Sequence, residues 1–136
     1  MRKISSVLYT VGLVISSLVG LLHFFAPYVT EWYSYIPDAP LEIYASIDYV
    51  NFFFSLLLTG LSLILLVFKK KIYQGSREVF VFYAFLVFTW FCRVLITIVI
   101  PWPTPLQKWL IVGFLSEFMI VFIPAIYLFN YKKSAR

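Results

Sequence analysis

Four uninterrupted apolar segments, each long enough to cross a lipid bilayer as one helix, dominate this sequence. They cover residues 5–27, 43–68, 79–100 and 106–130. A helix needs about 20 apolar residues to cross a hydrocarbon layer of about 30 Å. Only 12% of the residues are charged, whereas soluble domains average about 25%. The sequence therefore predicts an all-α, integral membrane four-helix bundle that forms a single domain over residues 1–136.

Basic residues gather on one side of this predicted bundle. Nine of the eleven lie before the first segment, between the second and third, or after the fourth. They are Arg2, Lys3, Lys69, Lys70, Lys71, Arg77, Lys132, Lys133 and Arg136. The positive-inside rule then predicts that both termini and the middle loop are cytoplasmic. This distribution indicates topology and contact with anionic membrane lipid, and we do not expect a nucleic-acid partner.

The first segment begins with basic residues, as a secretory signal peptide would. Its apolar stretch is longer than the 7–15 residues of a signal peptide, and no small-x-small cleavage site follows. We therefore expect it to be retained as a helix. Gly12, Ser16 and Gly20 recur at every fourth position on it, and such a stripe lets another helix approach closely in lipid.

Aromatic and proline residues mark the two outer connections. The segment 28–42 is rich in aromatic rings, so it is predicted to lie at the outer membrane surface. It either covers the mouth of the bundle as a short cap or serves as a simple interfacial anchor. The segment 101–105 holds three prolines, which predict a stiff outer turn. Most other aromatic residues are expected to face lipid or the interface.

Each apolar segment carries one ionisable residue, although such groups are costly in hydrocarbon and normally face a bundle interior. They are His23, Asp48, Arg93 and Glu117, and Asn51 adds an amide. With a rise of 1.5 Å per residue, all five lie about 6–15 Å below the outer boundary. We therefore expect them to surround one polar space in the outer half of the membrane, with Arg93 in contact with Asp48 or Glu117.

Two hypotheses explain this cluster. In a ligand site, Arg93 would grip an anionic or carbonyl group, and His23 would act as donor, acceptor or proton relay. In a structural network, Arg93 would hold Asp48 and Glu117 in closed salt bridges that fix the register of the helices. We favour the ligand site, formed by His23, Asp48, Asn51, Arg93 and Glu117.

Motifs for other chemistry are absent from the sequence. One histidine and one cysteine cannot supply a zinc site or bis-histidine haem ligation within one chain. There is no glycine-rich phosphate loop, no GxSxG and no HExxH. No nucleophile–base pair stands out either, so we predict no metal and no cofactor, and the sequence gives no ground for an enzymatic activity.

The first two segments carry a recognisable set of residues. The first closes with Gly20-x-x-His23-x-x-x-Pro27, a proline-bearing loop follows, and the second starts with an acidic residue in Asp48-Tyr49-Val50-Asn51. Together with Gly60, this resembles the DoxX-like group of small four-helix bacterial membrane proteins over about the first half of the chain. A few such proteins are linked to quinone-coupled oxidation of sulfur compounds or to redox stress. Arg93 and Glu117 belong to no motif of that group.

The leading hypothesis is a small bacterial inner-membrane protein that binds a small, partly polar ligand, such as a quinone or lipid-like molecule. The first alternative is an accessory subunit, in which the polar cluster is structural and the small-residue stripe docks a partner membrane subunit. The second alternative is a transporter. Four helices are few for a transport path, so that function would require a homo-oligomer.

Overall fold

The computed structural model describes the backbone of residues 1–134 and the side chains of residues 1–131. Four long helices make up most of it: α1 (Arg2–His23), α3 (Leu41–Val67), α5 (Arg77–Val99) and α6 (Gln107–Ser134). Short helices lie between them, namely α2 (Ala26–Val29), the 3-10 helix η1 (Trp32–Tyr35) and α4 (Lys69–Tyr73). The predicted all-helical class is confirmed, and all four long helices are long and apolar enough to cross a membrane. The predicted cytoplasmic side chains of Lys132, Lys133 and Arg136 lie outside the described residues.

Prolines set one end of α1, α3 and α5. α1 ends at His23, four residues earlier than predicted, because a proline at position 27 would clash with the carbonyl of residue 23 in a continuous helix. The chain turns and resumes as α2, where Pro27 lies near the start and its missing N–H costs no helical bond. α3 begins directly after Pro40, and α5 ends two residues before Pro101.

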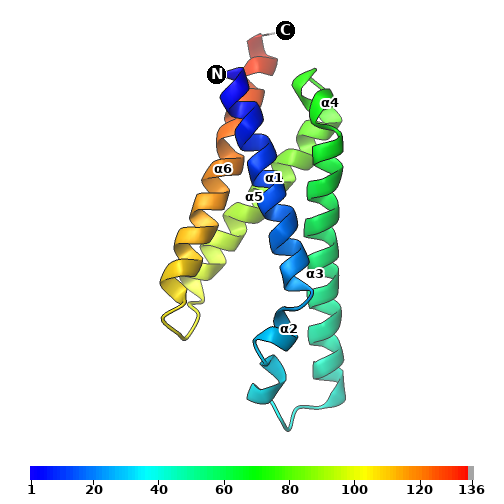
Figure 1. The fold of residues 1–136 in the computed structure, drawn as a ribbon, viewed down its shortest axis with the longest axis vertical. Helices are drawn as coiled ribbons and strands as arrows, with labels where there is room; N and C mark the ends of the chain where they lie inside the picture. The colour runs from blue at the N-terminus through cyan, green and yellow to red at the C-terminus, as the bar shows by residue number, and fades with distance from the viewer. Residues whose placement is uncertain (135–136) are drawn as a thin grey trace.

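α1 lies at the centre of the bundle, in contact with both α3 and α6 (Figure 1). Its glycines make this possible. A Cβ atom added at Gly12 would lie 2.6 Å from Val121 Cγ1 of α6, and one added at Gly20 would lie 2.8 Å from the backbone nitrogen of Thr59 of α3. Ser16, between the two glycines, is fully buried. The predicted stripe therefore faces two helices of the same chain, where only small residues permit this approach.

Two buried tyrosines tie the helices together in the half of the bundle nearer the N-terminus. The Tyr9 hydroxyl donates to the Leu65 carbonyl of α3 at 2.8 Å, and the Tyr83 hydroxyl of α5 donates to the Val121 carbonyl of α6 at 2.7 Å. The centroids of the two phenol rings are 4.7 Å apart. Both side chains are fully buried, so this pair belongs to the core, in contrast to the many aromatic side chains on the surface.

The helices separate toward the opposite end of the molecule. In Figure 1, α1 and α3 descend as one arm, and α5 and α6, joined by the turn at residues 100–106, descend as another. α2 and η1 lie beyond the last residue of α1, beside the first turns of α3. We call the end with the termini and α4 the closed end, and the end where the arms diverge the open end.

Candidate functional site

The last turn of α1 is completed by a side chain from α3. Asn51 Nδ2 donates to the backbone carbonyl of His23 at 2.7 Å and so satisfies one of the carbonyls that a helix leaves unpaired at its end. His23 Nδ1 lies 3.1 Å from the carbonyl of Val19. Because a carbonyl can only accept, Nδ1 carries the hydrogen in this contact, and Nε2 is the nitrogen available to a ligand. The imidazole also packs on Phe54, with centroids 5.1 Å apart.

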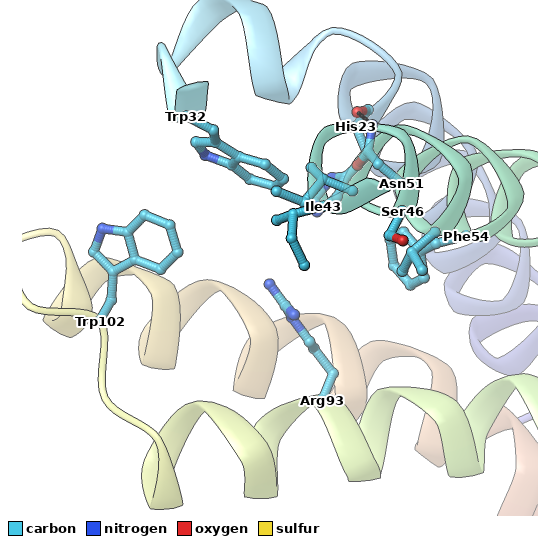
Figure 2. A pocket seen from close by; sticks show the side chains of 10 residues that line it. His23, Trp32, Ile43, Ser46, Asn51, Phe54, Arg93 and Trp102 are labelled. Carbon is cyan, nitrogen blue, oxygen red and sulfur yellow. Dashed lines mark hydrogen bonds between the residues drawn. The ribbon is translucent and has the colours of Figure 1, made fainter. Parts of the chain in front are cut away.

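Arg93 reaches toward the same region from α5. Its guanidinium lies 4.6 Å from the centroid of the Phe114 ring of α6, which is the geometry of a cation–π contact. Figure 2 shows the side chain extending from α5 toward Ile43 of α3, with its nitrogens leading. The arginine is half-buried, so its charge is held partly out of contact with solvent.

A cavity of about 600 Å³ lies between the two arms at the open end. α3 supplies most of its wall, α5 supplies Arg93, and His23 and Asn51 line it where α1 ends. Trp32 of η1 and Trp102 of the outer turn contribute indole rings on the side opposite Phe54 (Figure 2). The volume falls within the roughly 300–1,000 Å³ typical of small-molecule sites. One cation, one imidazole and two indoles thus surround a mainly apolar space.

Gln107 fixes the turn that carries Trp102. Its Oε1 accepts from the backbone N–H of Trp102 at 2.8 Å, and its Nε2 donates to the carbonyl of Thr97 at 2.6 Å. The first residue of α6 is therefore bonded to the last part of α5, on the same arm as Arg93. Trp32 Nε1 is buried and has no hydrogen-bond partner within the described part of the chain. A buried indole N–H normally has one, so this donor is left unsatisfied in the structure.

Asp48 does not line this cavity. Its side chain is exposed, and its carboxylate accepts a hydrogen bond from the Tyr33 hydroxyl of η1. That hydrogen bond, together with smaller effects of burial and of the nearby negative charge, raises the pKa of Tyr33 to about 12 because it stabilises the neutral phenol. The Tyr44 hydroxyl of α3 bonds the carbonyl of Ile36 at 2.6 Å in the same loop. Asp48 therefore helps to hold η1, and with it Trp32, against α3.

Glu117 is buried in the core, with 4% of its surface exposed. Its Oε1 accepts from Ser16 Oγ at 2.7 Å, and Ser16 Oγ accepts from Trp90 Nε1 at 2.8 Å. This chain of hydrogen bonds joins α6, α1 and α5. Trp90 and Phe114 line a narrow space next to Arg93, and Glu117 does not. Trp90 is thus bonded to Ser16, the partner of the carboxyl group, and Phe114 packs on the guanidinium of Arg93.

The structure splits the predicted five-residue cluster. His23, Asn51 and Arg93 line one cavity, whereas Asp48 holds η1 and Glu117 belongs to a buried chain. The expected contact of Arg93 with a carboxylate is wrong: within residues 1–131, Asp48 bonds Tyr33, Glu117 bonds Ser16, and Arg93 lies on Phe114. Helical spacing gives the depth and face of a residue on its own helix. It does not give the divergence of the arms, which sets the distance between helices.

Two aromatic residues that line the cavity, Trp32 and Trp102, were not predicted from the sequence, and neither was Gln107, which holds the turn of Trp102. Trp102 follows Pro101 in the stiff outer turn, and Trp32 lies in the loop that was expected to cap the bundle. The sequence could indicate the position of each tryptophan, since indoles favour the membrane interface. It could not indicate that the two rings face the same cavity as Arg93.

No protein-family model, curated protein or solved structure matches this chain. The cavity brings together Arg93, His23 and two indoles from the two arms. The chemistry open to such a set is the binding of a molecule with a hydrogen-bond acceptor at one end and an apolar body.

Proposed function

We propose that this chain is a multi-pass membrane protein that binds a small amphipathic molecule in the cavity between its arms. The observation that carries the proposal is the position of Arg93. Its half-buried guanidinium has an aromatic ring as its neighbour and extends into a cavity lined mostly by apolar and aromatic side chains. A cation in such surroundings is costly unless an anionic or carbonyl oxygen meets it. We infer that the ligand supplies this oxygen.

Membrane insertion is supported by the surface of the long helices. In the most apolar stretch of each, between 17% and 39% of the residues are buried inside the protein. Large apolar side chains cover much of the remaining surface, whereas soluble monomers rarely expose apolar patches beyond a few hundred Å². The closed end holds the N-terminus and α4 together (Figure 1), and with them Arg2, Lys3 and the lysines of α4. We therefore propose that the closed end is cytoplasmic.

Cysteine labelling tests this orientation. In a Cys92→Ser background, Gln74→Cys places a thiol at the closed end and Thr104→Cys places one in the outer turn. A membrane-impermeant maleimide should label position 104 in intact cells and position 74 only after the cells are opened. Labelling of position 74 in intact cells would reverse the orientation.

The cavity favours a ligand with a polar head and an apolar body. Arg93 is a donor, His23 Nε2 is an acceptor when the ring is neutral, and the remaining wall suits a ring or an acyl chain. A quinone has carbonyl oxygens on a flat ring, and a fatty acid has a carboxylate on a chain, so both fit this description. The DoxX-like assignment stays a proposal, and Gly20, His23 and Pro27, which carry that resemblance, lie at or beside the outer end of α1.

Binding can be measured with a short-chain ubiquinone and with oleate as probes. Either molecule should change the fluorescence of Trp32 and Trp102 in the purified full-length protein, and Trp32→Phe should remove part of that signal. Arg93→Gln should weaken binding about tenfold to a hundredfold, because it removes a hydrogen bond from a charged donor. Lys108→Gln is the matched control, since Lys108 is an exposed cation near the open end that does not line the cavity.

The two probes also separate the ligand classes. Binding of oleate alone would assign an anionic lipid-like ligand, and binding of the quinone alone would assign a carbonyl ligand. If neither binds, or if Arg93→Gln keeps its helical content and binds both as the wild type does, the proposal fails. In that case the alternatives are an accessory subunit or a transporter that works as a homo-oligomer. The small-residue stripe would not dock the partner of such a subunit, because Gly12 and Gly20 are already packed within the chain.

A further inference from the structure

A second cavity, which the ligand hypothesis does not use, lies at the closed end between α1 and the α3–α4 junction. Its volume is about 1060 Å³. Arg2 and Lys3 line it from α1, and Lys69 and Lys70 line it from α4. We name it the basic groove. Within the described part of the chain, its lining includes no carboxylate, so four like charges face one space without a counter-charge.

Hydrogen bonds hold the two walls of the basic groove in place. The hydroxyl groups of Ser5 and Tyr73 are 2.8 Å apart and join α1 to α4. Lys69 Nζ donates to Thr10 Oγ1 at 2.6 Å and joins α4 to α1 a second time. The walls of the groove are therefore fixed by the fold, whereas a run of solvated lysines would have no fixed arrangement. Lys71 illustrates the difference, because its Nζ lies 4.8 Å from the centroid of the Phe68 ring and it does not line the groove.

The lining of the groove changes from basic to apolar along the helix axes. Val7 and Val67 also line it, and they are 60% and 78% exposed. Val7 is four residues past Lys3, which places it about 6 Å deeper along α1 by the helical rise. Val67 likewise precedes Lys69 on the membrane side of α4. A molecule in the groove thus meets Arg2, Lys3 and Lys70 at one level and the two valines about 3–6 Å deeper. Lys69 is the exception, because its Nζ reaches Thr10, three residues past Val7.

We propose that the basic groove binds an anionic phospholipid, with the phosphate between Arg2, Lys3 and Lys70 and the start of an acyl chain against the two valines. Lysine and arginine clusters at the cytoplasmic edge of membrane helices attract anionic headgroups, and arginine suits phosphate geometry. A free phosphate ion would use the cations but not the valines, which is why the ligand is assigned as a lipid. The proposal shares membrane insertion with the proposed function but does not involve the Arg93 cavity.

Native mass spectrometry of the full-length protein in neutral detergent tests the proposal, with phosphatidylglycerol as the probe and phosphatidylcholine and inorganic phosphate as comparisons. Wild type should retain phosphatidylglycerol and melt at a higher temperature in its presence. The double variant Lys3→Gln with Lys70→Gln should bind it about thirtyfold more weakly, at about fivefold per lysine. Lys69 is left unchanged because it bonds Thr10.

Two further variants make the result interpretable. Lys71→Gln with Arg77→Gln removes the same charge from the same end without touching the groove, and it should retain the lipid. Lys3→Arg with Lys70→Arg keeps the charge and should also retain it, which separates lost binding from lost folding. Equal loss in the groove and control doubles would reduce the effect to diffuse surface charge and overturn the proposal. Equal stabilisation by phosphatidylcholine or by inorganic phosphate would also overturn it.

Discussion

Gly20 provides a sharp test of how the bundle is packed. A Cβ atom at this position would overlap Thr59 Oγ1, and it would lie 2.8 Å from the Thr59 backbone nitrogen and 3.1 Å from the Ser55 carbonyl oxygen. The threonine hydroxyl can rotate away, but the two backbone atoms belong to α3 and can move only if α3 separates from α1. We therefore expect Gly20→Ala to part the two helices.

The size of the effect follows from the matched glycine on α3. Gly60 has no atom within 4 Å of an added Cβ, so Gly60→Ala should be neutral or stabilise its helix by roughly 0.5–1 kcal/mol. Overpacking at Gly20 should cost about 1–3 kcal/mol. The free energies of unfolding of the two variants should therefore differ by roughly 1–4 kcal/mol, with Gly20→Ala the less stable.

Reversible unfolding in mixed detergents, followed by the far-ultraviolet circular dichroism of the helices, measures this difference. Gly113→Ala on α6 is a second control, since its Cβ would also meet no atom within 4 Å. If Gly20→Ala unfolds at the same detergent composition as Gly60→Ala, α1 and α3 do not pack as described, and the interpretation of the stripe is wrong.

Two other predictions concern the residues that sequence spacing had grouped with Arg93. Ser16→Ala and Glu117→Gln should be coupled by about 0.5–3 kcal/mol in a double-mutant cycle of unfolding, because the two side chains share a hydrogen bond. Arg93→Gln and Glu117→Gln should be more nearly additive, and the reverse order would restore the ion-pair hypothesis. The pKa of Tyr33 is raised from 10.0 to about 12 by its hydrogen bond to Asp48. This bond should therefore hold η1 on α3 fully below pH 10, and its stabilising effect should be lost as the pH rises to 12. Limited proteolysis of η1 should show this step in wild type, whereas a step of equal size in Tyr33→Phe would count against it.

The long helices and the small-residue stripe could be predicted because both depend on one helix at a time. Apolar length predicts a membrane-spanning helix wherever it lies, and small residues at every fourth position of α1 predict close approach whatever the neighbour is. The sequence did not say that Gly12 meets α6 while Gly20 meets α3. The end of α1 was placed four residues too late, although Pro27 carried the necessary steric information.

The candidate site was predicted in part, for a related reason. His23, Asn51 and Arg93 were grouped by depth, and they do line one cavity. Glu117 lies at a similar predicted depth, but Trp90 bonds Ser16 and thereby places an aromatic ring next to the carboxyl group's own partner. Which polar pairs form depends on side chains from a third helix, and the periodicity of any single helix carries no information about them.

The tyrosine bonds at the closed end determine where occupancy of the cavity can be observed. Tyr9 bonds α1 to α3, Tyr83 bonds α5 to α6, and the two rings pack together, so the arms share a common pivot. Because the two arms are joined at the closed end, a change in the angle between them displaces the open end most. A ligand that draws Arg93 toward α3 would change the separation of the arm tips more than any distance inside the cavity. Spin labels at Glu42 and Thr104 would then report binding as a change in one distance, with no label near the bound molecule.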